Sequence, residues 1–205
     1  QAVAGEPLTA EELRERIALG HAVLPKNVNH SFPTLRAIGR GLKTKVNANL
    51  GSSGECCLMD LEDAKLQAAL RARTDSIMDL STGGNLGGLR QYFLEKSTVM
   101  VGAVPIYALA TEMVCSHQPL EKMDGDQLLR SIEKQCMEGL DYITVHCGVT
   151  LASVKKLESF QRLMPCVSRG GSIHMHWMRA HLKENPRYEN FEDLLGIAHK
   201  NDVTL

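Results

Sequence analysis

Residues 76–96 read SIMDLSTGGNLGGLRQYFLEK, and this stretch decides the fold. A short β-rich run ends in the small and polar residues STGG, and a segment with helical spacing follows. In that segment the apolar residues recur at three- and four-residue steps, as an amphipathic helix requires. The stretch therefore predicts one strand–loop–helix unit.

The same unit recurs along the chain. Runs that read as strand ends lie at 44–51, 76–84, 100–107, 142–148, 165–171 and 202–205. Helix-patterned segments lie at 62–73, 86–96, 124–140, 151–160, 173–185 and 190–200. Strands that alternate with helices of this length predict parallel βαβ units whose sheet faces are covered.

Repetition of this unit favours a (β/α)8 TIM-type barrel over a doubly wound open sheet, because no strand-first GxGxxG stretch is present. The run at 202–205 ends the sequence inside the sixth predicted strand, which is too few to close an eight-stranded barrel. We therefore expect an α/β chain that is a barrel truncated after about six strands. A chain of this kind is expected to be a piece of a longer protein.

The first 40 residues differ in character from the rest. Thr9, followed three residues later by Glu12, is a capping-box pattern and predicts a helix that ends at Gly20. The segment 21–40 contains two prolines and reads as irregular chain. The predicted organisation is an N-terminal helical and irregular segment, 1–40, followed by a partial barrel, 41–205.

Composition excludes several classes of protein. The 205 residues carry a net charge of −1 without a basic block, so nucleic acid is not expected as a partner. The longest apolar run, 99–110, is too short to cross a bilayer, and the N-terminus lacks the pattern of a signal peptide. A cytoplasmic protein without a membrane partner is expected. The 6 cysteines lack Cys-x-x-Cys spacing and are interpreted as free thiols.

Polar and unusual side chains gather at the predicted strand ends, where a parallel barrel builds its active site. Asn47 and Asn49 alternate, so both are expected on one side of their strand. Met78 and Tyr107 occupy strand ends, where Met78 reads as a core residue and Tyr107 as either a wall residue or a donor to substrate. His146 lies near a glycine at a strand end, which favours contact with a ligand over a core position.

The run SRGG at 168–171 is compatible with a phosphate site. Consecutive glycines allow backbone amides to approach a ligand, and the positive end of the following helix favours an anion. Ser168 and Arg169 add side-chain donors. An ordinary tight turn without a ligand explains the same local pattern.

The histidines after this run do not predict a metal. His174 and His176 are two residues apart in a predicted helix, and side chains at that separation do not face each other. His174 and His181 share a face but lie about two turns apart, too far for one ion.

Five runs in this order, KVNANLG, IMDLSTGG, VPIY, TVHCGV and SRGGSI, resemble the ThiC family. The resemblance extends from about Ile17 to Leu205. It implies a (β/α)8 barrel and a lyase-class radical rearrangement of 5-aminoimidazole ribotide. It also implies a [4Fe–4S] cluster, S-adenosylmethionine and Zn²⁺ as cofactors, and a homodimer.

The resemblance assigns substrate contacts residue by residue. The implied ribotide site consists of Asn49, Met78, Tyr107, His146, Ser168, Arg169 and Gly170. The last three would hold the phosphate, Asn49 and His146 would hydrogen-bond the ribose or imidazole, and Met78 would pack against the ring. No catalytic residue is assigned, and the ligands of the cluster and of zinc are expected beyond Leu205.

Departures from the family pattern bear on the product. The runs NANLGSSGECC, VPIYALA and HMHWMRAH differ from the usual thiamine-type text. These changes favour a 5-hydroxybenzimidazole synthase of anaerobic cobalamin lower-ligand synthesis. The alternative is a phosphomethylpyrimidine synthase of thiamine biosynthesis, and a remoter one is a non-catalytic ribotide-binding fragment.

An ordinary phosphosugar aldolase or epimerase is a further reading. It requires a lysine or paired carboxylates at strand ends. Only Asp79 is well placed, since Lys45 lies at the start of its strand run.

Overall fold

A parallel four-stranded sheet forms the centre of the computed structural model, which describes residues 2–160 and 162–205. Its strands are β3 (Asn47–Leu50), β4 (Ser76–Asp79), β5 (Met100–Ala103) and β6 (Tyr142–Ile143). They lie in the order β3-β4-β5-β6, so each strand pairs with its neighbour in sequence. The four predicted strands at 44–51, 76–84, 100–107 and 142–148 are confirmed in type.

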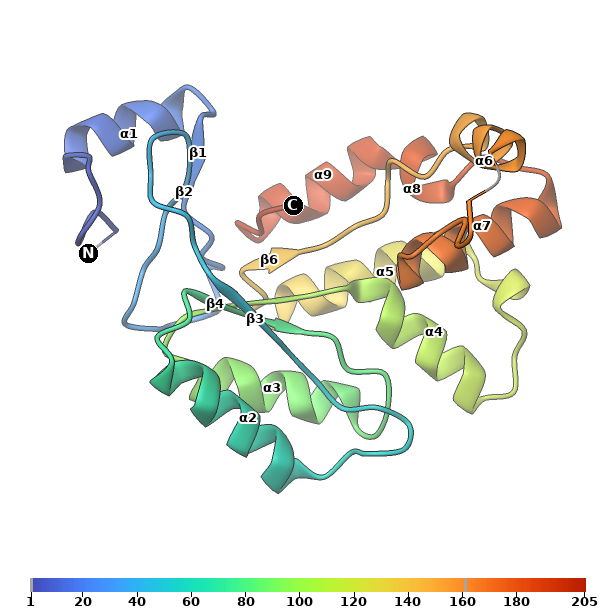
Figure 1. Cartoon of the computed structure of the whole chain (residues 1–205), viewed down its shortest axis with the longest axis horizontal. Coiled ribbons are helices and arrows are strands. Elements are labelled where there is room, and N and C mark those ends of the chain that lie inside the picture. The colour runs from blue at the N-terminus through green and yellow to red at the C-terminus, as the bar shows by residue number, and fades with distance from the viewer. Residues whose placement is uncertain (1, 161) are drawn as a thin grey trace.

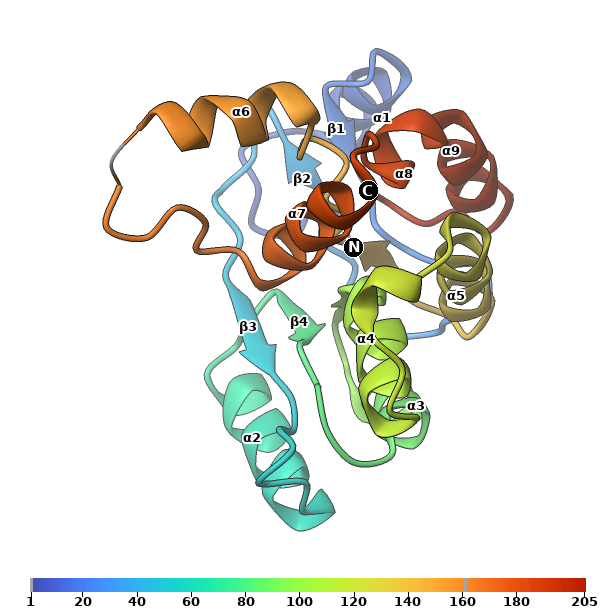
Figure 2. The same cartoon turned by 90° about the vertical axis from the view of Figure 1, so that its right-hand side faces the viewer.

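Helices connect these strands and continue after them. The connecting helices are α2 (Met59–Arg71), α3 (Leu86–Lys96), α4 (Pro105–Cys115) and α5 (Gly125–Met137), with a 3-10 turn η1 (Leu120–Lys122) before α5. The helices after β6 are α6 (Leu151–Ser159), α7 (Arg169–His181), α8 (Pro186–Glu189) and α9 (Phe191–Lys200). Figure 1 shows α2 and α3 below the strands and the N-terminal segment above them. Figure 2 shows α7 lying between α6 and α4.

The two faces of the sheet differ sharply. Ile77, Val101 and Ile143 are almost fully buried against the helices and belong to the main core cluster, together with Phe93 and Ile132. Successive side chains of a strand alternate between faces, so their neighbours in sequence face the other way. That other face carries polar groups, and it is the face on which the candidate site lies.

The prediction of a strand at 165–171 is wrong. The chain is irregular up to Ser168, and Arg169 already begins α7. The edge of β6 is instead taken by the end of the chain, where Tyr142 and Thr204 form a single parallel bridge. The predicted strand at 202–205 is therefore reduced to this bridge, which occupies the place next to β6.

The run VPIY is a helix start and not a strand end. Pro105 occupies the first turn of α4, where its missing N–H costs nothing. The sequence pattern of 105–115 was not recognised as a helix because it is apolar on most sides, and six of its residues are buried. Tyr107 consequently lies in the first turn of α4.

The N-terminal segment has more structure than predicted. The capping box is confirmed: Glu12 N donates to Thr9 Oγ1 (3.2 Å) and Thr9 N donates to Glu12 Oε2 (2.8 Å), at the start of α1 (Ala10–Ala18). Within the segment read as irregular, β1 (Ala22–Val23) pairs antiparallel with β2 (Ile38–Gly39). The division at residue 40 stays a prediction.

A buried polar cluster fastens this segment to the sheet. Asp141 is fully buried and accepts from Asn27 N (2.9 Å) and from Val101 N of β5 (2.7 Å). His30 is 5% exposed, and its Nδ1 and Nε2 face Asp141 Oδ2 (2.7 Å) and Leu94 O (2.9 Å). The His30 ring therefore bridges the Asp141 carboxyl and the backbone of α3 inside the core.

The sheet does not close into a barrel within the described residues, so the predicted barrel is not reached in this chain. Across 2–160 and 162–205, no helix has both the length and the apolar character needed to cross a membrane.

Replacing His30 by alanine should lower the free energy of unfolding by about 1–3 kcal/mol, because the buried Asp141 carboxyl and Leu94 O lose a hydrogen-bond partner. Urea unfolding monitored by circular dichroism measures the loss. His199→Ala, an exposed histidine of α9, is the matched control. Equal losses in the two variants would show that the buried pair does not stabilise the fold.

Candidate functional site

The polar face of the sheet forms the floor of the candidate site. Asn49 and Met78 are direct register partners on β3 and β4, so their side chains lie next to each other on this face. Asn47 Nδ2 donates to Asn49 Oδ1 (2.7 Å), which confirms that the two asparagines share one side of β3. Both asparagines are exposed and Met78 is half-buried, so all three can meet a ligand.

Tyr142 completes this floor, although no sequence pattern singles it out. Its hydroxyl lies 2.8 Å from both Asn47 Oδ1 and Ile77 O, and burial raises its pKa to about 12. Its ring covers Gly102, where an added Cβ would lie 2.3 Å from Tyr142 Cε2. Gly102 therefore allows the tyrosine to lie flat across the sheet. The position of the Tyr142 ring could have been suggested only by Gly102, its pairing partner on β5.

The loop after β6 joins the floor to the second part of the site. Thr144 Oγ1 lies 4.0 Å from Met78 Sδ, and His146 follows two residues later. Its ring packs directly on Gly170 of α7, where a Cβ would lie 2.2 Å from His146 Cε1. Burial lowers the pKa of His146, so its imidazole stays neutral at neutral pH.

The start of α7 has the geometry of an anion site. Ser168 is the N-cap, and its Oγ accepts from Gly171 N (3.1 Å). The amides of Arg169 and Gly170, in the first turn of this 13-residue helix, need partners outside the helix. Unpaired amides and the helix dipole together favour an anion at this point.

Arg169 adds a charge at the same place. Its guanidinium lies 5.2 Å from the centroid of the Tyr107 ring, a cation–π contact between α7 and α4. Both residues line a hollow of about 470 Å³ that is also bordered by Gly83 and Gly84. The loop after β4 therefore reaches the same hollow as Arg169.

The structure thus brings the seven residues singled out by sequence into two adjoining groups. Asn49 and Met78 belong to the floor, and Tyr107, His146, Ser168, Arg169 and Gly170 surround the start of α7. Thr144 connects the groups and was missed, since a threonine in a loop carries no local signal. The roles in substrate binding stay predictions.

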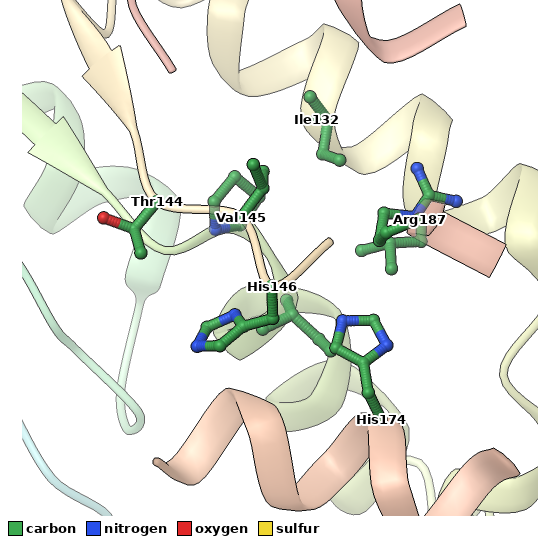
Figure 3. Close-up of a pocket in the computed structure, with 9 residues that line it drawn as sticks. Ile132, Thr144, Val145, His146, His174 and Arg187 are labelled. Atoms are coloured by element: carbon green, nitrogen blue, oxygen red, sulfur yellow. The ribbon is translucent and has the colours of Figure 1, made fainter. Parts of the chain in front are cut away.

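His174 was also missed as a partner of His146. It lies on the buried side of α7, 3% exposed, and the two ring centroids are 6.0 Å apart. Burial lowers the pKa of His174 to about 4, with smaller effects of His146 and of the Arg187 cation. Figure 3 shows the His174 ring rising from α7 beside His146, with Arg187 and Ile132 above the two histidines in this view.

Known proteins resemble this chain over its whole length. The model of the radical SAM ThiC family matches residues 1–205. This chain belongs to the radical SAM ThiC family. Phosphomethylpyrimidine synthases from Carboxydothermus hydrogenoformans and Desulfitobacterium hafniense are each 46% identical to it, over 98% and 100% of the chain respectively. These alignments cover 47% and 48% of the two relatives, so the chain spans about half the length of the proteins that it matches.

The ThiC family is a radical SAM family, which implies a [4Fe–4S] cluster and S-adenosylmethionine. The residues described here do not fit the cluster or a zinc ion. All six cysteines are free thiols, and in 2–160 and 162–205 no three His, Cys, Asp or Glu side chains are grouped to hold a metal.

Acid–base chemistry of the aldolase type is poorly supported. Asp79 is 5% exposed, and its carboxylate accepts from Ser81 N (2.9 Å) on the helix-covered side of the sheet. Burial raises the pKa of Asp79, but the group does not face the floor. Lys45 precedes β3 and lines the same hollow as Asn47 and Met78, but its ammonium is paired with Glu6 (2.8 Å).

The contact between Gly170 and His146 can be tested by adding one methyl group. Gly170→Ala should force the His146 ring to move and cost about 1–3 kcal/mol in unfolding free energy. Gly148→Ala is the control, because an added Cβ there meets nothing within 4 Å. Histidine ring resonances of selectively labelled protein report the displacement. Unchanged His146 resonances in Gly170→Ala would contradict the packing.

Proposed function

We propose that the full-length protein is a phosphomethylpyrimidine synthase, a lyase-class enzyme that converts 5-aminoimidazole ribotide into the hydroxymethylpyrimidine phosphate of thiamine biosynthesis. One observation carries the proposal. An anion site at the start of α7 adjoins a polar floor, and His146 lies between them. The relatives of that name support the pyrimidine product, whereas the benzimidazole product favoured by the altered sequence runs has no support among them.

The ribotide phosphate would bind at the start of α7. Amides of Arg169 and Gly170 face it, and the Arg169 guanidinium adds a positive charge that can pair with two phosphate oxygens. Ser168 holds Gly171 N and thereby orients the turn. Tyr107 supports Arg169 from below through the cation–π contact.

The ribose and imidazole would lie over the floor. Asn49 can donate and accept hydrogen bonds, and the neutral imidazole of His146 offers one donor and one acceptor. Met78 presents a polarizable thioether to the flat face of the imidazole. A polar end and a flat apolar contact together fix one orientation of the ribotide.

These residues catalyse by positioning. A bound cluster and S-adenosylmethionine would supply the radical chemistry of the family. Holding the ribotide in one geometry decides which C–H bond is exposed to reaction, and a displacement of about 1 Å can cost a factor of about 100 in rate. We propose that the ligands of the cluster and of zinc lie outside these 205 residues.

The barrel and the homodimer belong to the same proposal. Strands that follow one another around the sheet, with the main core on one face, are the arrangement from which a (β/α)8 barrel is built. The polar face of β3 to β6 would then line the barrel interior. A second copy of the full-length chain is the proposed partner, with no nucleic acid or membrane involved.

The product identifies the reaction. Full-length protein, reconstituted with its cluster without oxygen, is supplied with S-adenosylmethionine and 5-aminoimidazole ribotide. We expect a phosphorylated hydroxymethylpyrimidine by mass spectrometry. A phosphate-free hydroxybenzimidazole would overturn the pyrimidine assignment in favour of the cobalamin branch, and absence of both products would favour a ribotide-binding protein.

Removing the Arg169 guanidinium tests the phosphate site separately. Arg169→Ala should weaken ribotide binding about 10- to 100-fold, because a charge-assisted hydrogen bond is lost. Isothermal titration of the full-length protein with ribotide measures it, without any turnover. Lys183→Ala, an exposed cation just beyond the other end of α7, is the control. Equal affinities of Arg169→Ala and the control would contradict the assignment.

A further inference from the structure

The ribotide can reach His146 only through Nε2, because the other ring nitrogen, Nδ1, is buried. Nδ1 has no hydrogen-bond partner among the described residues. A buried polar atom without a partner costs free energy of about 1–3 kcal/mol, so native structures almost always supply one. The surroundings of Nδ1 therefore indicate which group provides its hydrogen bond.

Helix α7 presents two residues to His146. Gly170 and His174 are four residues apart and lie on the same face of the helix. The missing side chain of Gly170 admits the His146 ring, and the His174 ring stands beside it at 6.0 Å between centroids. At that separation the rings form a tilted pair with an interplanar angle of 44°, and Nδ1 of His146 makes no hydrogen bond to His174.

A cavity lies at this point. It has a volume of about 10 Å³ and is lined by His146, His174, Thr144 and Arg187, with apolar residues around them. A space of roughly 10–15 Å³ holds one water molecule, provided that two or more polar groups face it. His174 is 3% exposed and neutral, so it offers such a group without bringing a charge.

We propose that His174 is a positioning residue for His146, which it holds through a single buried water between the two rings, so that His146 carries its proton on Nε2. The inference rests on the proposed function only in that His146 contacts the ribotide. His174 itself touches no substrate. It also gives the altered run HMHWMRAH a physical connection to the site.

The choice of nitrogen follows from electrostatics. Arg187 is 1% exposed and its Nη2 donates to Gly125 O (2.7 Å), but its Nε and Nη1 have no partner among the described residues, so a cation with unused donors borders the cavity. A water in its field turns its oxygen toward the guanidinium and its hydrogens toward the rings. Nδ1 of His146 then accepts, and the proton of the neutral imidazole resides on Nε2, the nitrogen left for the ribotide.

The test compares three variants of the full-length protein. His174→Phe removes both ring nitrogens, His174→Gln keeps a polar group at the cavity, and His176→Gln changes an exposed histidine of the same helix as control. Nitrogen-15 spectra of labelled histidine report the tautomer of His146, with resonances assigned through His146→Gln. Circular dichroism confirms folding of each variant.

We expect Nδ1 of His146 to be unprotonated in the native protein and in His176→Gln, and a mixture of tautomers in His174→Phe. Ribotide affinity should fall about tenfold in His174→Phe and recover to within about threefold in His174→Gln, since a hydrogen bond is lost and then restored. If His174→Phe does not fold, His174→Leu replaces it.

Two outcomes would overturn the inference. One is an Nδ1–H tautomer in the native protein, and the other is the same tautomer in native protein and His174→Phe. Failure of the proposed function looks different. Native protein that does not bind ribotide contradicts that function, while the nitrogen spectra still decide the role of His174.

Discussion

The buried carboxylate of Asp141 is the constraint on which the rest of the structure depends. It lies immediately before β6 and contacts two segments that are far apart in sequence: Val101 N of β5, and Asn27 N with His30 Nδ1 in the N-terminal segment. A fully buried carboxylate is tolerated only when its oxygens are satisfied in this way. By holding β6 against β5, Asp141 also fixes where the chain leaves the sheet. That point determines the course of 144–149 and hence the position of His146.

How much of this fold can be predicted depends on whether the signal is local. Periodicity identified β3, β4 and β5 and most of the helices, because alternation and helical spacing record which face of each element is buried. It failed at 165–171, since no local pattern reveals that Thr204 already occupies the edge of β6. It failed again at 105–115, where α4 is apolar on most sides and the helical period is weak. In both cases the deciding information was the identity of a spatial neighbour.

The site follows the same rule. Asn47 and Asn49 were correctly placed on one side because strand alternation is a property of the backbone. The helix after SRGG was expected to begin at 173, but it begins at Arg169 with Ser168 as its N-cap. Tyr142 and Thr144 were missed because their partners lie on other strands. His174 was compared only with histidines of its own helix. The spacing of Gly170 and His174 was a usable signal. Residues i and i+4 lie on the same face of a helix, so the glycine leaves space for a neighbouring side chain and the large residue packs beside that side chain.

The unequal faces of the sheet argue for what the site is for. A parallel sheet buried on both sides is expected to carry apolar side chains on both. Here Ile77, Val101 and Ile143 satisfy that expectation on the helix-covered face, while Asn47, Asn49 and Tyr142 occupy the other. Polar groups in the interior of a barrel are stable only if they bond to each other, to water or to a ligand. Asn47 already forms hydrogen bonds with Asn49 and Tyr142. The polar groups that remain available to a ligand are those of Asn49 and of His146, next to the start of α7. The amide of Asn49 and the neutral imidazole of His146 are therefore the polar groups that the proposed ribotide would satisfy.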